Sequence, residues 1–105
     1  MKRFAKMLYC GAKLLVTFLR YMTEKNVGNY WDWLLIKCRT SNPTECELGF
    51  LIYDALHRND FHSVCNVYVE FRNSIDSFDR NGRLRNKIRS AAVSSMRKDV
   101  IGLLD

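Results

Sequence analysis

Residues 56–72 read LHRNDFHSVCNVYVEFR, and this stretch decides the fold. Its segment Arg58-Asn59-Asp60 predicts a tight turn, and Asp60 can cap a helix that begins at Phe61. The apolar face of that helix consists of Phe61, Val64, Cys65, Tyr68 and Phe71, and it continues to Ile75. Upstream, apolar residues recur at helical spacing at Leu48, Leu51, Ile52, Ala55 and Leu56. Two helices joined by so short a turn predict an αα-hairpin.

The first hairpin helix has its own start signal. Asn42 can act as its N-cap and Pro43 suits the first helical position. Glu45 lies three residues after Asn42, where its carboxylate can accept a hydrogen bond from the Asn42 amide in return. The preceding residues 30–38 form a dense apolar run, which fits either a short helix or a buried strand. We favour a short helix, because no partner strand is visible elsewhere in the chain.

Two amphipathic segments flank the hairpin core of residues 30–76. A helix is predicted over residues 3–25, with an apolar stripe of Phe4, Leu8, Gly11, Leu15, Phe18 and Met22. Another is predicted over residues 83–104, with a stripe of Leu84, Ile88, Ala92, Met96, Val100 and Leu103. The sequence therefore predicts an all-α fold, as one helical domain over residues 1–105. We expect four to five helices built on the central αα-hairpin.

The net charge of +6 is concentrated at the two ends of the chain. Residues 1–25 hold six basic residues and one acidic residue, and residues 80–105 hold seven basic and two acidic residues. Residues 26–79 hold four basic and eight acidic residues. The basic ends are therefore predicted to contact something negative, which could be nucleic acid, an anionic membrane surface or an acidic protein.

The predicted nucleic-acid contacts are the basic side chains of both ends. They are Arg80, Arg83, Arg85, Lys87 and Arg89, together with Lys6 and Lys13. Like charges one turn apart on a helix repel each other, so the C-terminal cluster does not serve helix stability. It could be a solvated face, a set of phosphate contacts or a nuclear-import signal. Residues 3–25 could likewise form a core helix with a solvated basic face, or a helix on a membrane or nucleic acid.

The tryptophans and the absence of enzyme motifs indicate a binding protein. Trp31 and Trp33 are predicted to anchor the core or to bind a partner protein. A homodimer is also predicted, because a small helical protein often buries surplus apolar surface between subunits. No P-loop or nucleophile-elbow motif occurs, and no glycine-rich loop accompanies the cysteines and histidines, so we predict no enzyme.

A zinc site is the strongest chemical candidate in the sequence. His62 and Cys65 stand one helical turn apart, which is how a helix supplies half of such a site. Cys38 and Cys46 could supply the other half, with His57 as a substitute ligand. The alternative is that Cys65 packs as a small apolar residue and His62 points to solvent or caps.

The apolar segment near the N-terminus fits neither a secretory signal nor a membrane span. Lys13 interrupts it, and no small-residue cleavage site stands at its end. Lys6, Lys13 and Arg20 would lie inside the bilayer if the segment crossed it. We therefore expect an intracellular, reducing compartment, in which disulfides are not the default.

The run Asp60-Phe61-His62-x-x-Cys65-x-x-Tyr68-x-Glu70-Phe71 resembles the core of the small virion-sense pre-coat protein of plant geminiviruses, most closely the curtovirus type. Residues 48–56 are similar to the first hairpin helix of the begomovirus relatives. Family members carry one Trp, two Cys and one His, for which this chain offers Trp33, Cys46 or Cys38, His62 and Cys65. The C-terminal Cys-x-Cys cluster of begomovirus members has no counterpart here.

The resemblance implies a suppressor of host RNA silencing. Such a protein acts by binding host silencing-pathway proteins, and in some cases RNA, and assists virus spread in the cytoplasm and nucleus of the host cell. The alternative is a non-enzymatic helical interaction protein, or a movement protein that lies on an anionic membrane surface through its N-terminal helix. The two hypotheses predict different ligands for the basic ends: RNA for the first and lipid for the second.

Overall fold

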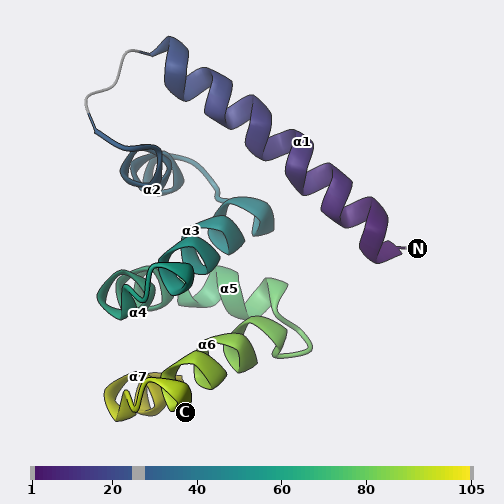
Figure 1. Cartoon of the computed structure of the whole chain (residues 1–105). Coiled ribbons are helices and arrows are strands. Elements are labelled where there is room, and N and C mark those ends of the chain that lie inside the picture. The colour runs from purple at the N-terminus through teal and green to yellow at the C-terminus, as the bar shows by residue number, and fades with distance from the viewer. Residues whose placement is uncertain (1, 25–27, 105) are drawn as a thin grey trace. The chain divides into compact units, whose positions relative to one another are not determined.

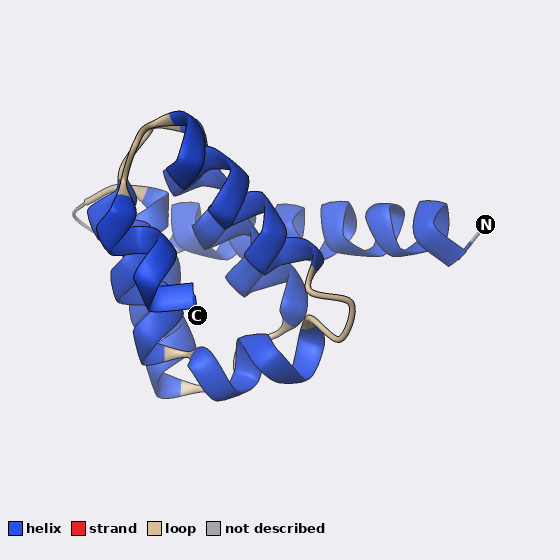
Figure 2. Cartoon of the chain, turned by 90° about the horizontal axis from the view of Figure 1, so that it is seen from below, coloured by secondary structure: helices blue, strands red, loops and turns tan. Residues whose placement is uncertain are grey.

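The computed structural model describes residues 2–24 and 28–104, with the backbone alone for residues 2–7. It confirms the all-α prediction, since the described residues form helices and connecting turns and no strand (Figure 1, Figure 2). The helices are α1 (Lys2–Thr23), α2 (Tyr30–Thr40), α3 (Glu45–His57), α4 (Phe61–Glu70), α5 (Arg72–Phe78), α6 (Arg83–Ser94) and α7 (Lys98–Leu104). The described part of the chain thus has seven helices, where the sequence predicted four to five.

The chain divides into two compact units, Met1–Glu47 and Leu48–Asp105, where the sequence predicted one domain. The first unit holds α1, α2 and the start of α3, and the second holds the rest of α3 with α4 to α7. The core of the second unit consists of Leu48, Leu51, Ile52, Ala55, Phe61, Val64, Val67, Tyr68, Ile75, Ile88, Ala92, Val100 and Leu104.

Aromatic rings join the two helices of the first unit, and residues 30–38 are helical as we favoured. The ring of Tyr30 on α2 packs edge-on against Phe18 and Tyr21 of α1, at centroid distances of 5.3 and 5.6 Å. The ring of Trp33 lies 5.7 Å from Tyr21, and its indole N–H donates to Glu24 Oε2 at 2.9 Å. Each such ring pair contributes about 0.5–1.5 kcal/mol beyond its buried area, so the cluster stabilises the α1–α2 contact.

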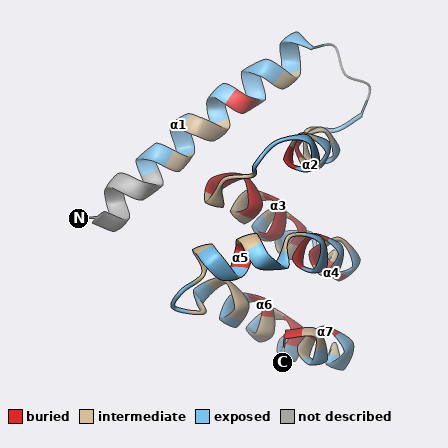
Figure 3. Ribbon diagram, turned by 180° about the vertical axis from the view of Figure 1, so that it is seen from behind, coloured by how far each residue is buried: buried red, intermediate tan, exposed pale blue. Residues whose placement is uncertain are grey.

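Most of the apolar stripe that the sequence assigned to α1 does not face the core of its unit, although Phe18 contacts Tyr30. Leu8, Leu15 and Met22 are 60%, 59% and 61% exposed, and most of the described length of α1 is exposed in Figure 3. The packed side of the helix instead carries Thr17, which is 4% exposed, and Tyr21. The core-helix alternative, with this stripe turned inward, is therefore wrong.

α3 begins with a different cap from the predicted one. Thr44 Oγ1 accepts a hydrogen bond from the Glu47 amide at 3.3 Å, and Glu47 Oε1 accepts one from the Thr44 amide at 3.2 Å. This reciprocal pair is a capping box. The prediction that Asn42 and Glu45 form the box is wrong, because the helix starts only at Glu45 and the pattern Thr-x-x-Glu lies further along.

A tight turn joins α3 to α4, as the sequence predicted. Asn59 adopts a φ of 56°. Its amide donates to the Leu56 carbonyl at 3.0 Å, and the Asp60 amide donates to the Ala55 carbonyl at 2.8 Å. A left-handed residue of this kind closes many helices, and asparagine tolerates the conformation. Asp60 then caps α4, since its carboxylate accepts a hydrogen bond from the Ser63 amide at 3.2 Å.

The second hairpin helix is shorter than predicted. α4 ends at Glu70 and α5 begins at Arg72, whereas the sequence predicted one helix that continued to Ile75. In the second unit α4 contacts both α5 and α7, and α6 contacts α7. The helix that follows the turn therefore packs against the C-terminal segment and not only within a hairpin.

The predicted C-terminal helix over residues 83–104 is divided into α6 and α7. Met96 adopts a φ of 56°, and its amide donates to the Val93 carbonyl at 3.1 Å. The Arg97 amide donates to the Ala92 carbonyl at 2.8 Å. The same hydrogen-bond pattern closes the helix before Asn59. Methionine rarely adopts the left-handed conformation, so the sequence gives no signal that a helix ends here.

Met96→Gly is expected to raise the free energy of unfolding by about 0.5–1 kcal/mol, measured by chemical denaturation. The left-handed conformation costs an L-residue about 1–2 kcal/mol, and the greater freedom of glycine in the unfolded chain offsets part of the gain. The Met96 side chain is 84% exposed, so little packing is lost. Asn59→Gly serves as the control and should change stability less. A less stable Met96→Gly protein would contradict backbone strain at this turn.

Candidate functional site

The start of α6 positions the C-terminal basic residues. Gly82 precedes the helix with a φ of 68°, and the Asp79 carboxylate accepts hydrogen bonds from the amides of Leu84 and Arg85 at 2.9 and 3.1 Å. Amides in the first turn have no partner within the helix, so this carboxylate satisfies them and complements the helix dipole. Arg80 lies in the same turn and is exposed.

The rest of the predicted basic cluster lies on two sides of α6, separated by its buried stripe. Arg83 and Lys87 share one side, are exposed, and form no ion pair within the part of the chain that the structure describes. Arg85 and Arg89 lie on the other side and are half-buried. Arg85 Nε is 3.7 Å from Asp79 Oδ2, so an ion pair already engages its charge. Arg83 and Lys87 are therefore the better placed pair for an anionic ligand.

A groove with a volume of about 610 Å³ lies beside Lys87 in the second unit. It is lined by Tyr53, Leu56 and His57 from α3 and by Lys87, Ser90, Ala91 and Ser94 from α6. Tyr53 is 43% exposed and offers an aromatic ring, while Lys87 offers a cation and the two serines offer hydroxyl groups. A ring beside a cation suits a nucleotide, whose base stacks and whose phosphate pairs with the charge.

The sequence analysis named Lys87 and His57 but missed Tyr53, Ser90 and Ser94. A signal was present, because Tyr53 and His57 stand one turn apart, and the residues of α6 that line the groove step by three or four. Each set therefore shares one face of its helix. Which face of α3 lies opposite which face of α6 depends on the packing of the unit, and periodicity does not encode it.

Cys46 forms a disulfide with Cys10, whereas we expected a reducing compartment in which disulfides are not the default. Their Cα atoms are 5.2 Å apart, although their sequence separation is 36. Cys10 lies on α1 and Cys46 lies in the first turn of α3, so the bond joins two helices of the first unit. Cys38 and Cys65 form no disulfide among the described residues, and the first is buried and the second half-buried.

The predicted zinc ligands do not form a set in the disulfide-bonded chain. The Cys46 sulfur is bonded to Cys10, and burial raises the pKa of the Cys65 thiol, with the charge of Asp99 adding to the effect. Zinc binds the thiolate and not the thiol. Among the described side chains no group of three or more His, Cys, Asp or Glu residues could hold a metal ion. The zinc site that uses His62 stays a prediction for the reduced chain.

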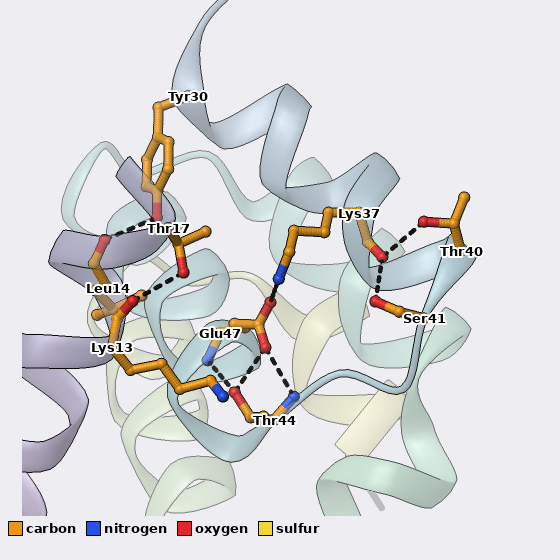
Figure 4. Close-up of polar contacts among 9 residues, drawn as sticks. All are labelled: Lys13, Leu14, Thr17, Tyr30, Lys37, Thr40, Ser41, Thr44 and Glu47. Atoms are coloured by element: carbon orange, nitrogen blue, oxygen red, sulfur yellow. Dashed lines mark hydrogen bonds and ion pairs between the residues drawn. The ribbon is translucent and has the colours of Figure 1, made fainter. Parts of the chain in front are cut away.

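A buried carboxylate lies at the junction of α2 and α3, and the sequence analysis missed it. The Glu47 side chain is 3% exposed, and Lys37 Nζ lies 3.0 Å from its Oε2 (Figure 4). The Thr44 hydroxyl donates to Oε1 at 2.7 Å. Burial disfavours the charged form, but the hydrogen bonds from Thr44 and Lys37 outweigh it and lower the pKa of Glu47. Each acceptor oxygen is thus engaged, which indicates a structural role.

The remaining predicted site residues lie in the first unit. Trp31 and Trp33 are half-buried on α2, and the ring contacts of Trp33 within the unit account for its burial. Lys13 is half-buried on α1, and the side chain of Lys6 lies outside the described residues.

The fold and the groove define a small all-α protein with a groove that Tyr53 and Lys87 line. No family model, curated protein or solved structure matches this chain. The resemblance to the geminivirus pre-coat proteins therefore stays a prediction. None of the helices among the described residues is long and apolar enough to cross a bilayer.

Proposed function

We propose that this protein is a non-enzymatic RNA-binding protein that suppresses RNA silencing in a host cell. The sequence resemblance of residues 48–56 and 60–71 supports the biological role, and the groove that Tyr53 and Lys87 line supports the ligand. The observation that carries the proposal is the position of Lys87, which is exposed on α6 and lines the same groove as Tyr53. Arg83 is exposed one turn before Lys87 on the same side of the helix.

Single-stranded RNA fits this surface better than a duplex does. In a single strand the bases are free to leave the stack and lie on an aromatic side chain, here Tyr53, while Arg83 and Lys87 contact the phosphates. A duplex hides its base faces and would use only the charges. The protein would act in the host cytoplasm and nucleus as a homodimer, and would also bind host silencing-pathway proteins.

Replacing both Arg83 and Lys87 with alanine is expected to weaken single-stranded RNA binding about tenfold or more at low salt. Each lost phosphate contact should also reduce the salt dependence, by about 0.7 in the logarithmic slope. Fluorescence anisotropy with a labelled oligonucleotide over a salt series measures both quantities.

The matched control is the double variant Arg85→Ala/Arg89→Ala, which removes the same charge from the same helix. It should bind RNA more tightly than Arg83→Ala/Lys87→Ala does, because an ion pair already engages Arg85. In the wild-type background, Tyr53→Ala should also weaken RNA binding, whereas Tyr53→Phe retains the aromatic ring and should bind RNA like the wild type. Equal losses in both double variants would show binding to net charge alone and would reject the groove. Absence of RNA binding at low salt would reject the RNA ligand.

A further inference from the structure

α1 exposes a continuous apolar side. Its largest exposed side chains there are Leu8, Leu15, Leu19 and Met22, which are 60%, 59%, 53% and 61% exposed. They follow one another at steps of three, four or seven residues, so they share one side of the helix. Leu8 and Met22 lie near opposite ends of residues 8–23, the part of α1 whose side chains the structure describes, so the apolar side runs along almost all of that part.

The first unit holds α1 by its opposite side. Thr17 is 4% exposed, the Leu14 carbonyl accepts a hydrogen bond from the Tyr30 hydroxyl at 3.5 Å (Figure 4), and Cys10 is bonded to Cys46. These contacts fix the rotation of α1 about its own axis within this unit. The helix therefore cannot roll to bury Leu15 against α2 without breaking them.

The charge of α1 indicates whether its apolar side binds a second copy of the chain or a lipid surface. α1 contains five basic residues and no acidic residue. Lys13 and Arg20 stand four and three residues from the buried Thr17, so both lie beside the packed side of the helix and away from Leu15. A second copy of the chain that docked α1 against α1 would bring two sets of positive charges together, which opposes association. An anionic lipid surface accepts the apolar side chains and attracts the positive charges together.

We propose that α1 lies in the plane of an anionic membrane surface, with Leu8, Leu15, Leu19 and Met22 in the acyl boundary and Lys13 and Arg20 at the lipid headgroups. The 22 residues of α1 extend for about 33 Å, which is ample for an interfacial helix. This site lies in the first unit and the RNA groove lies in the second, so the two surfaces do not share residues.

Flotation with lipid vesicles tests the proposal on the full, oxidised chain. Wild-type protein is expected to float with phosphatidylcholine vesicles that contain phosphatidylserine, and much less with phosphatidylcholine alone. Leu15→Ser/Leu19→Ser should lower the partition coefficient about tenfold or more. Arg20→Glu should lower it at low salt and make less difference at high salt. Circular dichroism checks that each variant retains its helices.

The matched control is Val69→Ser/Val93→Ser, which removes two apolar side chains that are each 58% exposed in the second unit. It should float like the wild type, and so should Arg83→Ala/Lys87→Ala, which separates lipid binding from RNA binding. Lack of flotation with phosphatidylserine at low salt would overturn the proposal, as would equal losses in both apolar double variants. A dimer in sedimentation that Leu15→Ser/Leu19→Ser dissociates, without vesicle binding, would assign the side to a second copy instead.

Discussion

Replacing Cys46 with serine is expected to lower the free energy of unfolding of the first unit by about 3–4 kcal/mol under non-reducing conditions. The disulfide from Cys10 closes a loop with a sequence separation of 36, and a cross-link over that length removes much chain entropy from the unfolded state. Both tryptophans, Trp31 and Trp33, lie in the first unit, so tryptophan fluorescence during denaturation reports on this unit.

Two controls accompany the cysteine variant. A reducing agent should destabilise the wild type by a similar amount and leave Cys46→Ser unchanged. Cys65→Ser, in the second unit, should leave the fluorescence transition in place. Thiol titration of the unfolded wild type should count two thiols, those of Cys38 and Cys65. If the reducing agent leaves the wild-type transition where it was, the disulfide does not stabilise the unit.

Replacing Lys37 with methionine is expected to cost about 2–3 kcal/mol at neutral pH. Methionine retains most of the aliphatic length of lysine but leaves the Glu47 carboxylate, which is 3% exposed, without its cation. The Thr44 hydrogen bonds remain and limit the loss. Chemical denaturation of the first unit, followed by tryptophan fluorescence, measures the change, and Lys98→Met removes the same charge from an exposed position as the control.

The cost of the Lys37 substitution should depend on pH. Because the pKa of Glu47 is lowered in the folded chain, the stabilisation is fully present above the ordinary glutamate pKa of about 4.3. It is lost as the pH falls through the lowered value. The difference between wild type and Lys37→Met should therefore shrink in acid. Glu47→Gln removes the titrating group, so its stability should fall less between neutral pH and acid. A difference that persists unchanged below the pKa would assign the effect to lost packing of Lys37.

Much of the local structure was predictable from neighbouring residues. Asp60 was identified as a cap, and the turn at Arg58-Asn59-Asp60 was placed between two helices, because both signals act over a few residues. The cap of α3 was predictable in kind and wrong in position. Two capping boxes compete at this helix start, one of Thr44 with Glu47 and one of Asn42 with Glu45. The buried ion pair of Glu47 with Lys37 favours the box that contains Glu47. The break at Met96 had no sequence signal, since methionine is neither glycine nor asparagine.

From the sequence, the candidate RNA site was predictable only as a set of basic residues, with no indication of which of them form the site. Arg83, Arg85, Lys87 and Arg89 alternate along the sequence, and like charges there gave no reason to choose among them. The buried stripe of α6 separates these residues into two sides, and the ion pair with Asp79 engages Arg85 on one of them. On the other side, Tyr53 of α3 lines the same groove as Lys87. Those are contacts between elements, which composition and spacing do not report.

The sequence by itself determined that the chain is helical, where the turn at Asn59 lies and how the charge is distributed, because these depend on composition and on interactions within a few residues. Only the tertiary structure decided that Cys46 bonds to Cys10, that the apolar stripe of α1 faces outward, and that Lys87 lies beside Tyr53. Each of these depends on which helix faces pack together. Periodicity identifies the faces of a helix, but the neighbour that each face meets is settled by the packing of the whole unit.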